Sequence, residues 1–596
     1  MFARRVTALL IAPALLSNAP PPPGVAPRVA VDEGSPVRCK AAPPELFYSR
    51  TSGVAMPAPG APPPPPPPPS PPPPPSPPPP PPPPPVSVQS LPSPAPSFIA
   101  SPTVAPPAPP APRVSPRTAG ITAPYGAPEN SERYDGRPVA TITDTATTPV
   151  STFAVDVDTG SYANVRRFLT KGQPVPPEAV RTEELLNYFR YDYPRPANAA
   201  QPFSIATDVA VTPWNPATRL IRIGLRGYDV AAATRPPVNL VFLVDTSGSM
   251  GRPDKLPLVK TALRGLAERL RPDDRVAIVA YAGSAGIVLE PTAQKKYVDA
   301  ALACLDAGGS TAGGQGIELA YATARANFRK GAVNRIILAT DGDFNVGVSS
   351  TKALEELVKR NRDDGITLTT LGFGEGNYND AMMERIADVG NGNYAYIDSA
   401  MEAQKVLGDE MAATLVTIAK DVKVQVEFDP ARISQYRLIG YENRALREED
   451  FTNDAVDAGD MGAGHQVTAL YEVVPAGAPG WTPARRYPAN RAPTVAPRGA
   501  EACFVKLRYK LPDGTTSSEL TRAIPAGVLA AARAPTGDMA FAAAVAAYGQ
   551  KLRGDTYLGR FTFADARRLA GSPRDYWRQE FVKLTTLAEA QRAGGA

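Results

Sequence analysis

Four short, almost continuously apolar runs, each followed by a polar loop that contains glycine or proline, constrain this chain more than any other feature. They are Asn239–Val244, Val276–Tyr281, Arg335–Ala339 and Ile366–Leu371. Such runs are typical of parallel strands that are covered on both faces. Amphipathic segments lie between them, at Lys255–Leu270, Gly316–Phe328 and Ala353–Arg360. This alternation predicts right-handed βαβ units and an α/β fold with a doubly wound, mainly parallel sheet.

Polar residues follow these strands where a ligand would bind. The first run leads into Asp245, Ser247 and Ser249, the third leads into Asp341, and a glycine-rich loop between them carries Thr311. Ligands of such sheets bind at the carboxyl ends of the strands. Glycines in these loops let the backbone turn sharply and approach a ligand closely. We therefore expect the two carboxylates and three hydroxyls to lie at one site.

The donor atoms of this site are all oxygen, which favours Mg²⁺ or Mn²⁺ over zinc or copper. Two carboxylates neutralise a divalent ion, and hydroxyls fill further positions without adding charge. The metal would then accept one more oxygen ligand, such as a carboxylate from outside the chain.

Composition excludes several other kinds of chemistry. His465 is the single histidine, so a zinc site built on two or three histidines is impossible within one chain, and its glycine neighbours predict a turn residue. Cys39, Cys304 and Cys503 are too widely spaced for a CxxC pair or a dense disulfide framework. The net charge is +5, without a Lys/Arg run that would follow a phosphate backbone, so we expect no nucleic-acid partner.

The order Asp-x-Ser-x-Ser, a threonine in a glycine-rich loop, and Asp-Gly after a later strand resembles the metal-ion-dependent adhesion site of von Willebrand factor type A domains. The resemblance implies that Asp245, Ser247, Ser249, Thr311 and Asp341 bind Mg²⁺ or Mn²⁺. It also implies that the hydroxyls bind directly and the carboxylates directly or through water. An Asp or Glu of a protein partner would complete the coordination.

Two acidic motifs outside this set are weaker candidates. Asp343 is expected to cap or solvate its loop rather than bind the metal. The segment Asp156–Gly160 hints at a calcium loop but lacks the later acidic positions that such a loop needs.

The flanking regions predict a second architecture around this α/β domain. Alternating apolar residues indicate half-buried strands on both sides of it, at Phe203–Val211, Arg219–Leu225, Val422–Phe428, Val467–Val474 and Cys503–Lys510. We expect a β-sandwich built from both ends of the chain, with the α/β domain inserted in it. An amphipathic helix is predicted over Ala540–Leu552, and Pro475–Ala500 is expected to be a long exposed connection.

These flanks also resemble those of a bacterial subfamily of von Willebrand factor type A proteins. The similar segments are Ser151–Leu169, Arg181–Pro194, Tyr436–Asn443 and Asp457–Glu472, and the resemblance covers about residues 129–590. The subfamily is often exported or lipid-anchored. Cys39 lies in Ser-Pro-Val-Arg-Cys, which is not a lipoprotein cleavage motif and argues against a lipid anchor here.

The N-terminal part predicts export followed by a disordered segment. Met1–Ala19 has the shape of a secretory signal, although Pro13 and Pro20 do not suit one. Of the 25 residues from Ala61 to Pro85, 22 are proline, which favours polyproline II and a stiff spacer from a membrane or wall. The alternative is a ligand for an aromatic-lined groove. Residues 20–125 are too poor in apolar groups to form a core.

The predicted organisation is a signal peptide at 1–19, a spacer at 20–125, flanking regions at 126–235 and 411–596, and the α/β domain at 236–410. We expect a non-enzymatic, metal-dependent protein-binding module of the periplasm or cell envelope. An alternative is an accessory subunit of an ATPase-coupled, chelatase-like assembly, whose ATPase would be another chain. A third is a phosphoryl-transfer enzyme with Asp245 as nucleophile, but Ser247 stands where the general acid should be.

Overall fold

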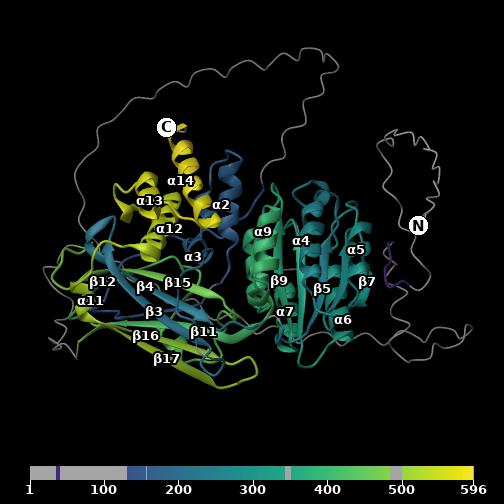
Figure 1. Ribbon diagram of the computed structural model, residues 1–596, viewed down its shortest axis with the longest axis horizontal. Coiled ribbons are helices and arrows are strands. Elements are labelled where there is room, and N and C mark those ends of the chain that lie inside the picture. The colour runs from purple at the N-terminus through teal and green to yellow at the C-terminus, as the bar shows by residue number, and fades with distance from the viewer. Residues whose placement is uncertain are drawn as a thin grey trace, which may run out of the picture. The chain divides into compact units, whose positions relative to one another are not determined.

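The four apolar runs form strands of one six-stranded sheet, whose order is β10-β9-β8-β5-β6-β7 (Figure 1). Its strands are β5 (Val238–Asp245), β6 (Arg275–Tyr281), β7 (Ala285–Thr292), β8 (Val333–Thr340), β9 (Ile366–Phe373) and β10 (Tyr394–Ile397). All neighbours are parallel except β6 and β7. The predicted doubly wound, mainly parallel sheet is confirmed.

A computed structural model describes residues 35–39, 131–155, 157–196, 198–231, 233–342, 351–482 and 500–594. They belong to a compact unit that spans residues 1–46 and 129–596. The predicted signal peptide, the proline-rich tract, Asp343 and most of the loop Pro475–Ala500 lie outside the described residues. Within the described part of the chain, no helix is both long and apolar enough to cross a membrane.

Helices connect the strands of this sheet and lead from β10 to the sandwich. They are η3 (Gly248–Gly251), α4 (Leu256–Glu268), α5 (Lys295–Cys304), α6 (Gly313–Ala326), α7 (Thr351–Asp363), α8 (Asp380–Val389), α9 (Ala400–Gln404), η4 (Lys405–Asp409) and α10 (Met411–Leu415). The strand order runs from β5 to β6 in one direction and from β8 to β9 in the other. Right-handed crossovers therefore place α4 and α7 on opposite faces of the sheet. The strand order reverses between β5 and β8, the switch point of the sheet, so a ligand would bind at the carboxyl ends of these two strands.

Two antiparallel sheets flank this domain and form the predicted sandwich. One has the order β1-β12-β15-β4-β3 and the other β13-β2-β11-β16-β17, with β14 paired to β11. Strands from before the inserted domain are β1 (Thr143–Asp144), β2 (Val150–Ala154), β3 (Phe203–Thr212) and β4 (Asn215–Gly227). Those after it are β11 (Thr417–Phe428), β12 (Ile433–Ile439), β13 (Ala445–Leu446), β14 (Met461–Gly462), β15 (Gln466–Pro475), β16 (Glu501–Lys510) and β17 (Ser517–Pro525). Each sheet thus combines strands from both ends of the chain.

Helices from both ends of the chain also pack together beside the sandwich. They are α2 (Gly160–Thr170), α3 (Thr182–Asn187), α12 (Gly537–Arg553), α13 (Phe563–Ala570) and α14 (Tyr576–Gly594); shorter turns are η2 (Pro177–Ala179), η5 (Glu448–Phe451), α11 (Ala526–Ala530) and η6 (Thr556–Leu558). The predicted helix at Ala540–Leu552 is present as α12. Its predicted amphipathic character is wrong, because residues 539–550 are all buried. Small alanines let the surrounding helices and sheet approach it from every side.

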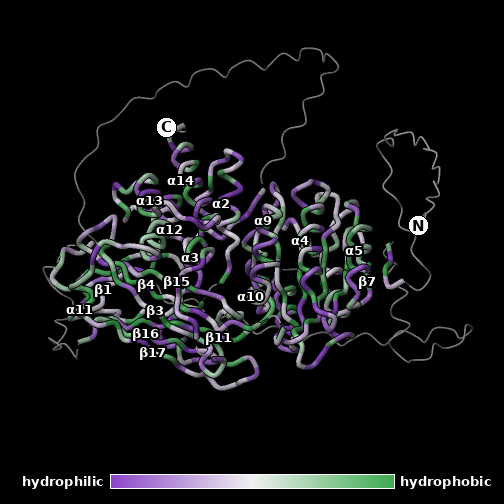
Figure 2. The backbone as a smooth tube through the Cα atoms, viewed as in Figure 1, coloured by the Kyte–Doolittle hydropathy of each residue, from purple (hydrophilic) through white to green (hydrophobic). Residues whose placement is uncertain are grey.

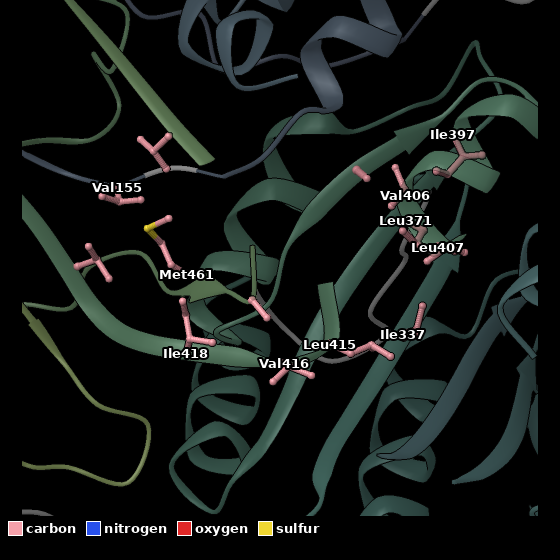
Figure 3. Close-up of a cluster of buried hydrophobic side chains, with 14 of the residues drawn as sticks. Val155, Ile337, Leu371, Ile397, Val406, Leu407, Leu415, Val416, Ile418 and Met461 are labelled. Carbon is pink, nitrogen blue, oxygen red and sulfur yellow. The ribbon is translucent and has the colours of Figure 1, made fainter. Parts of the chain in front are cut away.

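The inserted domain and the sandwich share one hydrophobic core. Figure 3 shows this cluster passing from Ile337 and Leu371 of the six-stranded sheet, through Val406 of η4, to Val416 and to Ile418 of β11 in the sandwich. Hydrophobic residues concentrate along the strands of both parts (Figure 2). Burial of such a continuous surface stabilises the two parts as a unit.

A short N-terminal segment is fastened to the outer edge of the six-stranded sheet. Val37 pairs antiparallel with Leu289 of β7, and Cys39 forms a disulfide with Cys304 at the end of α5. The two cysteines are separated by 265 positions, so no local sequence signal predicted this bond. A sulfur atom in a disulfide cannot also carry a thioether-linked lipid.

Candidate functional site

Asp245 lies at the end of β5, where three donors hold its carboxylate. The backbone N–H of Ser247 donates to Oδ1 at 2.9 Å, while the hydroxyls of Thr340 and Tyr281 donate to Oδ2 at 2.8 and 3.1 Å. Thr340 ends β8 and Tyr281 ends β6, the two strands that pair with β5. The carboxyl ends of three adjacent strands therefore fix the orientation of one carboxylate.

The two serines of the first loop lie next to each other at the edge of the site. Their hydroxyl oxygens are 3.1 Å apart. Ser247 is buried and Ser249 is exposed, so the oxygen pair extends from the interior towards solvent. A ligand from outside could reach this side of the site.

The glycine-rich loop that carries Thr311 is joined to the first loop through the backbone. The N–H of Gly308 donates to the carbonyl of Thr246 at 2.8 Å, and the N–H of Gly248 donates to the carbonyl of Gly309 at 3.0 Å. Gly309 has φ +82°, a conformation that favours glycine. These bonds join the loop of the half-buried Thr311 to the loop that carries Ser247 and Ser249.

The third loop places Asp341 directly after Thr340, beside the Asp245 carboxylate. Gly342 follows with φ +85°, and a Cβ there would lie 2.5 Å from the backbone nitrogen of Asn379, so a larger residue would displace the loop. The buried Asp341 carboxylate accepts a hydrogen bond from the Lys255 ammonium at 2.9 Å. The structure thus brings the three loops of the predicted site together at the switch point.

The buried charges of this site are two carboxylates, Asp245 and Asp341, and the ammonium of Lys255. Burial, the largest effect, raises the pKa of Asp245, and the nearby Asp341 carboxylate raises it further, whereas hydrogen bonds from Ser247 and Thr340 lower it. Lys255 compensates one of the two negative charges, so a divalent ion would meet a site that still carries a net negative charge. Among the described residues, no group of three or more His, Cys, Asp or Glu could hold a metal ion. A metal at Asp245 and Asp341 would therefore depend on hydroxyl and water ligands, which suits Mg²⁺.

Three residues of this site were missed from the sequence. Thr340 and Tyr281 could have been found, because each ends a strand adjacent to β5 in a doubly wound sheet. Lys255 could not, because its position before α4 resembles an ordinary helix start. Only the folded chain brings its ammonium to Asp341.

Asp158 and His465, from the two motifs that the sequence does not favour as sites, both make specific contacts in the fold. Asp158 accepts a hydrogen bond from the backbone of Tyr394 at 2.8 Å and lies 3.5 Å from Arg444, so it links the sandwich to the edge strand β10. Asp156 lies outside the described residues. His465 lies in the turn between β14 and β15, as its glycine neighbours predicted, and its Nδ1 accepts from the N–H of Gly462.

The strand order and the three loops at its switch point define a von Willebrand factor type A domain, and residues 239–409 match the family of that description. Residues 128–222 match the family described as von Willebrand factor, and residues 413–591 match the one described as Uncharacterized protein YfbK, C-terminal. The chain is 46% identical over 470 residues to Uncharacterized protein YfbK of Escherichia coli (strain K12), covering 77% of this chain and 80% of that protein. The chain belongs to the YfbK family.

Other similarities cover less of the chain or are weaker. Uncharacterized protein sll0103 of Synechocystis sp. (strain ATCC 27184 / PCC 6803 / Kazusa) is 36% identical over 188 residues, covering 31% of this chain and 43% of that protein. The solved structure of von Willebrand factor type A from Catenulispora acidiphila aligns with a TM-score of 0.35 and 17% identity, covering 67% of this chain and 91% of that one.

Proposed function

We propose that this protein is a non-enzymatic binding module that holds Mg²⁺, or Mn²⁺, and uses it to bind an acidic residue of a protein partner. Asp245, Ser247, Ser249, Thr311 and Asp341 would hold the ion. When bound, the ion supplies a Lewis-acidic position for a carboxylate oxygen. The chain's own residues orient the ligands and keep one side of the site open.

One observation carries this proposal most directly: the Asp245 carboxylate is oriented by three donors from three strand ends and lies beside a second buried carboxylate. The buried Lys255 ammonium compensates one of the two negative charges, and a divalent ion would compensate the one that remains. Ser249 is exposed and its hydroxyl lies 3.1 Å from that of the buried Ser247, so a partner could approach the site from this side. A site used only for structure would not need that opening.

We further propose that the protein acts in the periplasm or cell envelope. The Cys39–Cys304 disulfide supports this location, because disulfides form and persist in oxidising compartments. The signal-like Met1–Ala19 supports it as well. An N-terminal association with membrane or wall would place the site near surface partners.

Thermal unfolding of the full chain tests metal binding, with Mg²⁺, with Mn²⁺ and with EDTA. A ligand at 100 times its dissociation constant stabilises a protein by about 2.7 kcal/mol, which we expect as a shift of several degrees. Asp245→Ala should abolish the shift. Asp513→Ala is the matched control, because Asp513 is an exposed turn residue between β16 and β17 and should leave the shift intact.

Partner binding is tested separately, by capturing envelope proteins on immobilised protein in Mg²⁺ and eluting with EDTA. We expect specific partners to elute with EDTA and to be absent from an Asp245→Ala column. Partners that stay bound in EDTA, or that bind both columns equally, would contradict a metal-dependent mode.

A further inference from the structure

The Lys255 ammonium is a built-in cation of the candidate metal site. Its Nζ donates to Oδ2 of Asp341 at 2.9 Å and to Oδ1 of Asn377 at 3.1 Å. The side chain of Lys255 is 3% exposed and that of Asp341 is 1% exposed. A lysine so deeply buried with its partners is part of the site rather than a surface residue that happens to reach it.

The path of the Lys255 side chain is shaped by the loop between β9 and α8. Gly374 in this loop has φ +72°, and a Cβ added there would lie 2.3 Å from Cγ of Lys255. Any larger residue at Gly374 would therefore push the lysine away from Asp341. Asn377, from the same loop, accepts a hydrogen bond from the ammonium at the end of the Lys255 side chain. The ammonium is held from two sides.

From this geometry we infer that Lys255 sets the charge of the site so that metal and acidic ligand bind together; the inference rests on the function proposed above. Asp245, Asp341 and Lys255 sum to a charge of −1. A divalent ion changes this to +1, and one carboxylate from a partner then brings it to zero. Without the lysine, the metal alone would neutralise the site, and a partner's carboxylate would add an uncompensated negative charge.

Two consequences follow from this charge balance. Because Lys255 repels a divalent ion, it weakens metal binding when no acidic ligand is present. Because the metal-loaded site keeps a positive charge, a carboxylate binds it better, and by thermodynamic linkage the carboxylate tightens metal binding by the same factor. Lys255 thus gives the site selectivity for acidic partners at a cost in affinity for the metal alone.

The test is titration calorimetry of the full chain with Mg²⁺, in acetate and in chloride at matched ionic strength. In wild type we expect acetate to tighten Mg²⁺ binding. Lys255→Gln keeps a donor near Asp341 but removes the charge. It should bind Mg²⁺ more tightly in chloride, on the order of 10- to 100-fold, with a much smaller effect of acetate. Lys255→Arg keeps the charge and should retain the wild-type acetate effect.

Different outcomes separate this inference from the proposed function. Loss of Mg²⁺ binding in Asp245→Ala, together with unchanged affinity and acetate effect in Lys255→Gln, would overturn the inference and leave the metal site standing. Absence of Mg²⁺ binding in wild type would overturn both. If Lys255→Gln unfolds in EDTA, the wild-type titrations still decide, because Mg²⁺ binding that acetate leaves unchanged overturns the role of Lys255.

Discussion

Thr340 donates its hydroxyl to Oδ2 of Asp245 at 2.8 Å, across the parallel pair of β8 and β5. Both side chains are fully buried. The bond connects the strand that carries the first candidate ligand with the strand that leads into Asp341. It therefore couples the positions of the two carboxylates.

Replacing Thr340 by valine tests this coupling. The change preserves the shape of the side chain but removes the donor, so the free energy of unfolding should fall by about 1.5–3 kcal/mol, as for hydrogen bonds to charged groups. Groups that orient metal ligands typically affect affinity 10- to 100-fold, and we expect a loss of about this size for Mg²⁺ by calorimetry. Thr340→Ser, which keeps the hydroxyl, is the control. Equal Mg²⁺ affinity in both variants would show that Asp245 does not need this donor.

A buried ion cluster joins the inserted domain to the helices beside the sandwich, and it gives the second prediction. Arg166 of α2 pairs with Asp398 at 2.5 Å and Glu402 at 2.7 Å in the inserted domain, and with Glu580 of α14 at 2.9 Å. Arg166→Met leaves these carboxylates without their cation. It should cost about 3–5 kcal/mol in urea unfolding.

The matched control replaces one of the carboxylates that lose Arg166 with a neutral side chain. Burial raises the pKa of Glu402, and Arg166 opposes that effect, so Glu402 should be the most affected carboxyl. Arg166→Met combined with Glu402→Gln should regain part of the lost stability. A double variant less stable than Arg166→Met alone would contradict this assignment.

His465 should make stability depend on pH between about 6.5 and 4. Burial, the largest effect, lowers its pKa to about 4; Glu410 raises it, and Arg190 and Lys405 lower it further. The unfolded chain takes up a proton near pH 6.5, whereas the folded protein takes it up only near pH 4. The contribution of His465 is therefore complete above pH 6.5 and is lost as the pH falls to 4, with a size of about 3 kcal/mol.

The measurement is urea unfolding of wild type and His465→Gln at pH 7 and at pH 4.5. Other groups titrate in this range, so the relevant quantity is the difference between the two proteins. Wild type should lose more stability on acidification than the variant. Parallel losses in both proteins would show that His465 is already protonated in the fold or is solvated.

The fourth prediction concerns the disulfide. In oxidising buffer, Cys304→Ser should be less stable than wild type by about 2–4 kcal/mol, and the difference should disappear in reducing agent. Peptide mapping of wild type without reduction should recover Cys39 and Cys304 in one linked species. Cys503→Ser is the control, because Cys503 is buried and free, and its substitution should preserve the response to reducing agent. A wild-type protein from the periplasm with free Cys39 would contradict the pairing.

The α/β sheet was predictable because its signals are local. The run at Asn239–Val244 is apolar from its second residue onward, and β5 extends only from Val238 to Asp245 around it. The five proposed ligands could be named because they follow strands whose ends must meet in a doubly wound sheet. Both β7 and β10 were missed, since β7 is an antiparallel edge strand and β10 has only four residues.

What remained hidden depends on contacts between distant parts of the chain. Lys255 reaches Asp341 only after β5, β8 and β9 are aligned. The burial of α12 on all sides could not be read from its sequence, because alanine is compatible with either environment. The disulfide from Cys39 to Cys304 is likewise a contact between distant parts of the chain.

The Cys39–Cys304 disulfide shortens the covalent path between the N-terminus and the domain that carries the candidate metal site. With Cys39 joined to Cys304, the proline-rich tract becomes part of a closed ring, and only the residues before position 39 set the reach of the tether. Reduction would open the ring, and once Val37 also separates from β7, the covalent path would lengthen by the contour length of residues 39–131, at most roughly 300 Å. If the protein is attached through its N-terminus and binds a partner at the metal site, as proposed above, the oxidised molecule would keep that partner nearer to the attachment point than the reduced one.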